Sequence, residues 1–296
     1  MKAAKKISSL PFVLTASAAL LVGISGCSDR NRDLVEASGL AIDHYLLQAT
    51  VCVDINSDKQ CSDNEPRDIT DGSARFSLGT FTPAPLVVLA TPGITTQSRE
   101  QGGVGDPIER RFFLTAPLNS STVTPLTTLV QVGVEQGIYA DFNTGAIAVS
   151  QALNVPFDTD IQNYDYLSAG DVKVSVASEI IGGAIADAIA NIEANVTGPT
   201  ATTENILETA VKVLIDPSLA GNSSTGSSLM EEIGDAVDAA VDAGLTDIFI
   251  IEKAIEDDSS IISANDVDQA TLEAAVEETN TVNVTGEATG ATGASA

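Results

Sequence analysis

The sequence predicts an α+β fold, with an N-terminal antiparallel β-sandwich-like domain at residues 34–118 and an all-α helical domain at residues 119–278. Three observations lead to this prediction. Before residue 118 the chain has short, β-branched segments that turn residues separate. After Thr124-Pro125 the apolar residues recur at helical spacing. Hydrophobic residues make up 44% of the chain, which is enough for packed cores and excludes global disorder.

The first 26 residues are predicted to be a lipoprotein signal peptide. Three lysines lie in the first six residues, and the apolar stretch at 10–22 is too short to span a membrane. The segment ends in Ile-Ser-Gly-Cys at residues 24–27, which resembles the lipobox of bacterial lipoproteins. The resemblance implies cleavage before Cys27, diacylation of that cysteine and acylation of the new amino terminus. The alternative is an ordinary secretory peptide with a chance cysteine.

The lipobox resemblance also implies a location. Two or three acyl chains anchor a protein stably to a membrane. Ser28, and not an aspartate, follows the cysteine, which in the sorting logic of this family implies the outer membrane of the cell envelope. Residues 27–33 are polar and are expected to form a tether.

The charge balance limits the possible partners. The chain has 14 Lys and Arg against 41 Asp and Glu, and removal of the signal peptide would change the net charge from −27 to −30. Such an acidic protein is repelled by nucleic acid and by anionic membrane surfaces. We therefore expect no nucleic-acid partner and a membrane contact made through the lipid anchor.

The lipobox resemblance also determines how many cysteines remain for a disulfide. Lipidation of Cys27 would leave Cys52 and Cys61, which lie nine residues apart in an exported protein. A disulfide between them is then the default, and so short a loop would stabilise the fold by about 2–3 kcal/mol. The alternative is two reduced thiols. A pair of cysteines without histidine partners is a poor zinc pattern.

The segment at 51–66 has the spacing of a calcium-binding loop. Asp54, Asn56, Asp58 and Glu65 stand at relative positions 1, 3, 5 and 12. Calcium takes six to eight oxygen ligands at roughly 2.3–2.6 Å, and alternate residues of a curled loop point toward one centre. The carboxylate at position 12 can then close the site.

Two further ligands are predicted, and the loop departs from the usual calcium-binding pattern at two points. Gln60 would offer its backbone carbonyl, and Ser62 would hold a ligating water. Lys59 replaces the usual glycine at position 6, where a positive φ costs a non-glycine residue about 1 kcal/mol or more. The segment at 49–53 before the loop reads as a strand and not as a helix. The alternative to calcium is an acidic surface loop shaped by Asp and Asn turn chemistry.

A family resemblance surrounds this loop. Five short runs follow one another, namely SGL at 38–40, ATVCVD at 49–54, EP at 65–66, TDG at 70–72 and FSL at 76–78. Together they resemble the small prealbumin-like, B-repeat-type β-sandwich modules of bacterial surface proteins. The resemblance implies a calcium-loaded module that acts as a rigid spacer or in adhesion. The sequence departs from the pattern at Lys59 and Ser73.

The strands and helices are expected in order along the chain. The strand candidates are 35–42, 49–54, 74–78, 86–90 and 111–115, and the helix candidates are 125–136, 141–153, 171–195, 203–215, 228–243, 246–257 and 266–278. Expected N-caps are Thr124, Asp171, Thr246 and Ser228, the last in a capping box with Glu231. Runs at 123–130, 152–155 and 165–167 resemble a helical segment that often follows such β modules in exported proteins of marine-type bacteria.

The helix expected at 171–195 has two adjacent apolar stripes, so it should be buried against several partners. Its small residues Gly182, Gly183 and Ala184 would permit close approach of another helix. A membrane-dimer interpretation is disfavoured because acidic residues interrupt the apolar run. The tail at 279–296 is rich in Thr, Gly, Ala and Ser and is expected to be disordered.

The sequence contains no catalytic pattern that we can identify. His44 is the only histidine and is expected in a turn, and no Gly-rich phosphate loop occurs. A hydrolase with two spatially paired carboxylates is the enzymatic alternative, since such a pair is invisible in one sequence. We expect no enzyme.

The leading functional prediction is a lipid-anchored cell-envelope protein. It would act as a structural or adhesive surface module whose loop is stabilised by calcium and a disulfide, with a protein or surface as its partner. The alternative is an envelope ligand-binding or assembly lipoprotein whose helical domain docks a protein partner.

Overall fold

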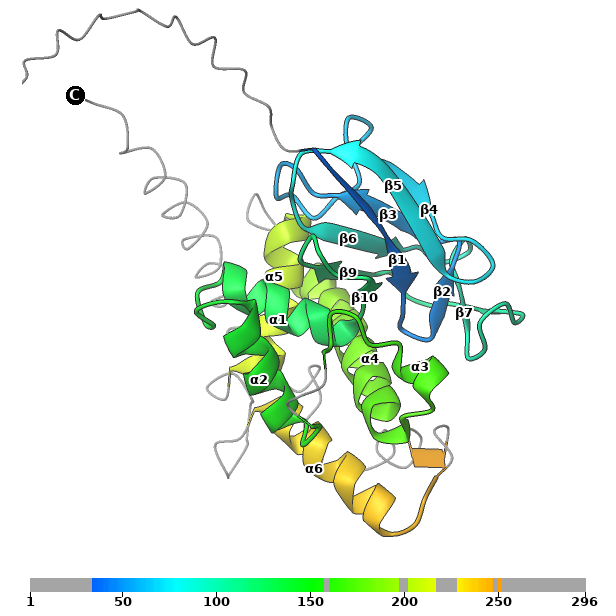
Figure 1. The fold of residues 1–296 in the computed structure, drawn as a ribbon. Helices are drawn as coiled ribbons and strands as arrows, with labels where there is room; N and C mark the ends of the chain where they lie inside the picture. Colours follow the sequence, from blue (N-terminus) through cyan, green and yellow to red (C-terminus); the bar gives the residue numbers. More distant parts are fainter. Residues whose placement is uncertain (1–33, 157–159, 197–201, 217–227, 247–249, 252–296) are drawn as a thin grey trace, which may run out of the picture. The chain divides into compact units, whose positions relative to one another are not determined.

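The computed structural model describes residues 34–156, 160–196, 202–216, 228–246 and 250–251 (Figure 1). Outside the described residues lie the expected signal peptide with Cys27, the tether, the tail at 279–296, the helix expected at 266–278 and most of that expected at 246–257. The described residues all belong to one compact unit. No helix in the described ranges is both long and apolar enough to cross a membrane.

Strands come first and helices second, which confirms the predicted α+β fold (Figure 1). The strands are β1 (Val35–Ala41), β2 (Tyr45–Leu47), β3 (Thr50–Val53), β4 (Arg67–Ile69), β5 (Arg75–Phe81), β6 (Leu86–Ala90), β7 (Thr96–Ser98), β8 (Asp106–Pro107), β9 (Phe112–Ala116) and β10 (Thr122–Val123). The five predicted strands correspond to β1, β3, β5, β6 and β9. The other five have only two or three residues, too few for a period-two pattern to stand out.

The strands form three sheets, with orders β10-β1-β5, β2-β7-β8 and β4-β3-β6-β9. Neighbouring strands pair antiparallel, except that β1 and β10 pair in parallel. The parallel pair differs from the purely antiparallel arrangement that was expected. It arises because β10 enters the sheet beside β1 after a long excursion of the chain, at Leu40 opposite Thr122.

The described helices are α1 (Pro125–Glu135), α2 (Phe142–Ala152), α3 (Tyr166–Ala169), α4 (Val172–Asn195), α5 (Thr203–Ile215) and α6 (Leu229–Asp242). Three predicted N-caps are confirmed: the side chains of Thr124, Asp171 and Ser228 each accept a hydrogen bond from the backbone three residues on. The predicted capping box of Ser228 with Glu231 is present. The short helix α3 was not predicted.

Buried threonines join the sheet to the first helix. The edge strand β9 contacts α1, and the backbone N–H of Thr115 donates to the hydroxyl of Thr128 at 2.9 Å. The hydroxyl of Thr127 donates to the carbonyl oxygen of Thr115 at 3.0 Å. An edge strand exposes backbone groups that need partners. Helix α1 supplies these partners and so covers this edge of the four-stranded sheet.

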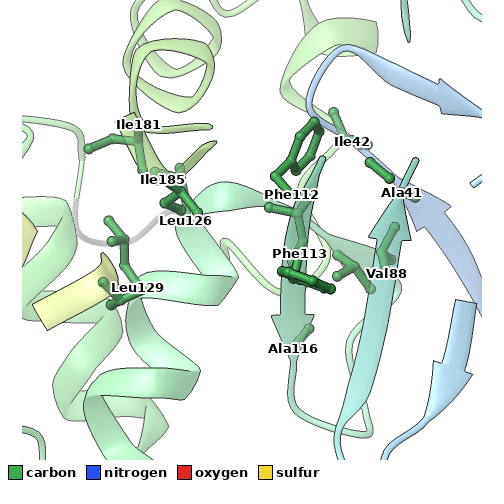
Figure 2. Close-up of a cluster of buried hydrophobic side chains, with 14 of the residues drawn as sticks. Ala41, Ile42, Val88, Phe112, Phe113, Ala116, Leu126, Leu129, Ile181 and Ile185 are labelled. Carbon is green, nitrogen blue, oxygen red and sulfur yellow. The ribbon is translucent and has the colours of Figure 1, made fainter. Parts of the chain in front are cut away.

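One apolar core cluster contains residues of both strands and helices. Figure 2 shows part of it, with Val88 and Phe113 from the sheet, Leu126 and Leu129 from α1, and Ile181 and Ile185 from α4. The predicted isoleucine stripe of α4, from Ile181 to Ile192, is fully buried. The division into domains at residue 118 stays a prediction, since the shared core does not test whether either part folds alone.

Candidate metal-binding loop

The acidic loop connects β3 to β4, and a disulfide braces it. Cys52 lies in β3 and is bonded to Cys61 of the loop, with the two Cα atoms 5.5 Å apart. The structure therefore confirms the predicted disulfide. The bond ties the middle of the loop to the strand from which it leaves, and this restricts the loop before any ion binds.

Three carboxylates of the loop converge. Asp54 and Glu65 are only 1% and 5% exposed, and Asp58 is half-buried. One ligand oxygen from each of the three lies within 4.8 Å of those of the other two. Oxygens that each lie about 2.4 Å from one ion are separated by no more than about 4.8 Å. The arrangement therefore fits a single hard cation.

Backbone N–H groups hold these carboxylates in place. The N–H of Asp58 donates to Asp54 Oδ1 at 3.0 Å. The two oxygens of Glu65 accept from the N–H groups of Ile55 and Ser62, both at 2.9 Å. The bond from Ile55 to Glu65 spans the loop, and the other two are local. They fix the curled loop that brings its first and last carboxylates to one centre.

The three other predicted ligands lie in the same loop and bond to these carboxylates. The side-chain amide of Asn56 donates to Asp58 Oδ2 at 2.8 Å, and the backbone N–H of Gln60 donates to Asp58 Oδ1 at 2.8 Å. Ser62 holds Glu65 through its backbone. The structure therefore brings together Asp54, Asp58 and Glu65, and it places the other three residues next to them.

Lys59 has the backbone conformation that its position in the loop requires, with φ of 54°. This is the left-handed region expected where the pattern prefers glycine. The side chain is buried, and its Nζ lies 3.3 Å from Asp54 Oδ2 and 2.9 Å from Glu135 Oε1. Because Glu135 is the last residue of α1, the lysine connects the loop to the helical region.

The surrounding charges show a surplus of buried acid. Burial raises the pKa of Asp54, and the nearby Lys59 opposes that shift only in part. Burial acts to lower the pKa of Lys59, but Glu135 and Asp54 outweigh it, so that pKa is raised. Burial also raises the pKa of Glu204 on α5, where Lys59 lowers it and Asp54 raises it. A buried surplus of negative charge favours an added cation.

The link to α1 could not have been found from the sequence pattern. Lys59 and Glu135 are 76 positions apart, and the lysine stood out only as a cation in a glycine position. A second group was also missed, in which Asp43 and His44 lie with Glu179 of α4 along one cavity. His44 is in a turn as expected, but its side chain lies against that helix.

Comparison with protein-family models, with curated proteins and with solved structures finds no match for this chain.

Proposed function

We propose that this protein is a lipid-anchored structural or adhesive module of the bacterial cell envelope, and that its acidic loop binds calcium. The observation that carries the proposal is the convergence of Asp54, Asp58 and Glu65 within 4.8 Å in a loop braced by a disulfide. The resemblance to B-repeat-type modules points the same way. It supplies the expectation of a rigid spacer or adhesion role.

Calcium suits the donor set better than other common ions. All three converging donors are carboxylate oxygens, whereas zinc prefers nitrogen and sulfur. Calcium also tolerates irregular geometry with six to eight ligands, while magnesium demands a near-ideal octahedron. The side chain of Asn56, the carbonyl of Gln60 and a water near Ser62 would complete the coordination.

The bound ion would stiffen the junction between sheet and helices. It would compensate the charge of Asp54 and Glu65 at the end of β3, next to the ion pair that Lys59 makes with α1. This is a structural role without turnover. A partner protein or surface would be bound elsewhere on the module, and docking through the helices is the alternative role.

The membrane attachment rests on residues 24–27 and has its own test. Replacing Cys27→Ala should leave an unprocessed precursor that carries no lipid, detected by mass and by labelling with a fatty-acid analogue. Fractionation of the wild-type protein should place it in the outer membrane. Normal maturation of the variant would contradict the anchor and leave the calcium site unaffected.

Calcium titration calorimetry tests the ion site directly. The oxidised protein should bind one calcium per chain, and Asp58→Asn should weaken binding at least tenfold because it removes one of three charged ligands. Asp63→Asn is the matched control, since Asp63 lies in the same loop, outside the triad, with its side chain 93% exposed. This control should bind as the wild type does.

A thermal melt gives a second measurement. At a calcium concentration one hundred times Kd, binding should add about 2.7 kcal/mol to the free energy of unfolding. Chelator should remove this increment from the wild type and from Asp63→Asn, and at most about 1.4 kcal/mol from Asp58→Asn, whose weaker binding leaves it less saturated at the same calcium concentration. A melt that is unchanged by chelator, in a protein with an intact disulfide, would exclude calcium and leave an acidic turn.

A further inference from the structure

A second acidic site lies away from the calcium loop, in a cavity of about 350 Å³. Its walls come from the turn after β1, from β7, from the segment at 107–112 and from α4. A cavity of this volume is at the lower end of the range of small-molecule sites. Nothing in the proposed calcium function uses it.

A buried carboxylate with unmet bonding capacity lines this cavity. The side chain of Glu179 is 6% exposed, and its Oε1 lies 2.5 Å from Nε2 of His44. That contact is an ion pair only if the imidazole is protonated, and Oε2 of Glu179 has no hydrogen-bond partner among the described residues. A buried charge without hydrogen bonds is costly, so the site favours a ligand that donates them.

Asp43 places a second carboxylate on the same wall. It is 5% exposed, and Nε2 of Gln97 donates to its carbonyl oxygen at 2.9 Å and lies 3.4 Å from its Oδ2. The carboxylate packs against α4 at Gly182, where a Cβ atom would come within 2.2 Å of Oδ1. The small residues of α4 therefore admit a carboxylate, and not a second helix as their pattern suggested.

The charge of the lining selects a cation. Four acidic residues line the cavity, against Arg110 and His44, and Arg110 is already paired with Asp187. Burial raises the pKa of Asp43 to about 7, His44 lowers it and Glu179 raises it. A positively charged ligand would relieve both buried carboxylates at once.

The geometry favours an organic cation over a metal ion. The carboxylates of the calcium loop are the only group of metal-donor side chains that converges within the described residues, and neither Asp43 nor Glu179 belongs to it. The lining also has apolar residues, including Ile108, Phe112 and Ala186. We propose that this cavity binds a small molecule with a primary ammonium group and a short apolar tail. The ammonium donates to Glu179 and Asp43, and the tail contacts the apolar residues of the lining.

The experiment uses n-hexylammonium at pH 8 and its neutral analogue 1-hexanol. The protein has one histidine, so the imidazole C–H resonances in an NMR titration come from His44, which lines this cavity and a neighbouring one, and the variants below separate the two. Hexylammonium should shift these resonances saturably, and hexanol should not. The full chain is used with the Asp58→Asn substitution, which weakens calcium binding in the loop, and without added calcium, so the result does not depend on the proposed calcium function.

Two variants and a control connect binding to the cavity. Glu179→Gln should weaken binding about tenfold or more, because it removes a charged acceptor. Gly183→Leu fills the cavity without a change of charge and should abolish binding, since nothing lies within 4 Å of a Cβ at Gly183. Glu193→Gln, on the same helix but paired with Arg111 outside the cavity, should bind as the parent does.

Three results would each overturn the proposal. The first is equal shifts with hexylammonium and hexanol, which would show apolar binding alone. The second is displacement of hexylammonium by micromolar calcium in the Asp58→Asn background, which would show a metal site. The third is unchanged affinity in Gly183→Leu, a variant whose fold can be verified by its spectrum, since the ligand would then bind elsewhere.

Discussion

The molecule contains two buried acidic centres, and the carboxylates of the two differ in their hydrogen-bond partners. In the loop after β3, Asp54 and Glu65 accept hydrogen bonds from backbone N–H groups, and Lys59 lies against Asp54. In the cavity beside α4, Glu179 Oε1 lies against His44 Nε2 and Oε2 has no hydrogen-bond partner among the described residues, and Asp43 is desolvated enough that its pKa is about 7.

The difference shows what each centre can hold. Carboxylates that the backbone orients toward one point present a fixed set of oxygens, which is what a hard metal ion requires. Carboxylates that lie apart along an open cavity are negatively charged but do not point to a common centre. A flexible organic cation can bind to two such carboxylates at once. Burial alone therefore does not identify a metal site. The deciding feature is whether the oxygens converge.

The largest expected effect concerns Asp43 and pH. Its pKa rises from an ordinary value of 3.8 to about 7 in the folded protein, so the folded state holds a proton that the unfolded state releases. The resulting stability is complete below pH 3.8 and is lost as the pH rises to about 7. A shift of this size corresponds to about 4 kcal/mol.

Asp43→Asn should remove this pH dependence, so its stability relative to wild type should rise by up to about 4 kcal/mol between pH 4 and pH 8. Urea denaturation at several pH values measures the difference, and Asp63→Asn controls for the loss of a carboxylate. Parallel pH curves for wild type and Asp43→Asn would contradict the burial of a protonated Asp43. The titratable or charged groups that face Asp43 are His44, Glu109, Arg110, Tyr166, Glu179 and Asp187.

The next effect concerns Lys59 in the acidic loop. Lys59→Met leaves Asp54 and Glu135 without their cation, and breaking a buried ion pair costs about 3 kcal/mol or more. Without calcium the free energy of unfolding should fall by this amount. In saturating calcium much of it should return, because the ion then compensates Asp54 and no ammonium repels it.

Urea denaturation without calcium measures the loss of stability, and denaturation in saturating calcium measures how much of it returns. Lys173→Met is the control, since Lys173 pairs with Asp238 between α4 and α6 and is partly exposed. Its loss should cost at most about 1 kcal/mol, with no dependence on calcium. If Lys59→Met were equally unstable with and without calcium, the lysine and the ion would not share one electrostatic site.

Local signals in the sequence were enough to predict the fold class and much of the structure of the acidic loop. Thr124, Asp171 and Ser228 marked helix starts because N-capping involves residues only three positions apart. The ligand spacing from Asp54 to Glu65 is equally local, and so is the positive φ of Lys59.

What could not be predicted depends on tertiary contacts. The partner of Lys59 lies on α1, and the partner of His44 lies on α4, 135 positions away in the numbering of the chain. The small residues of α4 were expected to admit another helix, but at Gly182 a carboxylate makes the close approach, and no sequence pattern indicates this. Asp43 fills that role, and its burial depends on the packing of a turn against a helix that is distant in sequence.

The smallest expected effect compares two adjacent glycines of α4. Alanine at Gly182 would place its Cβ 2.2 Å from Asp43 Oδ1, whereas nothing lies within 4 Å of a Cβ at Gly183. Gly183→Ala should therefore stabilise the protein by about 0.5–1 kcal/mol through helix propensity. Gly182→Ala gains the same propensity but overpacks the contact with Asp43, for a net loss of about 1–2 kcal/mol. Urea denaturation of the two variants measures the change in the free energy of unfolding, which should have opposite signs. Equal stabilisation by both would mean that Asp43 does not pack against α4, and the acidic wall of the cavity would then lose one of its two carboxylates.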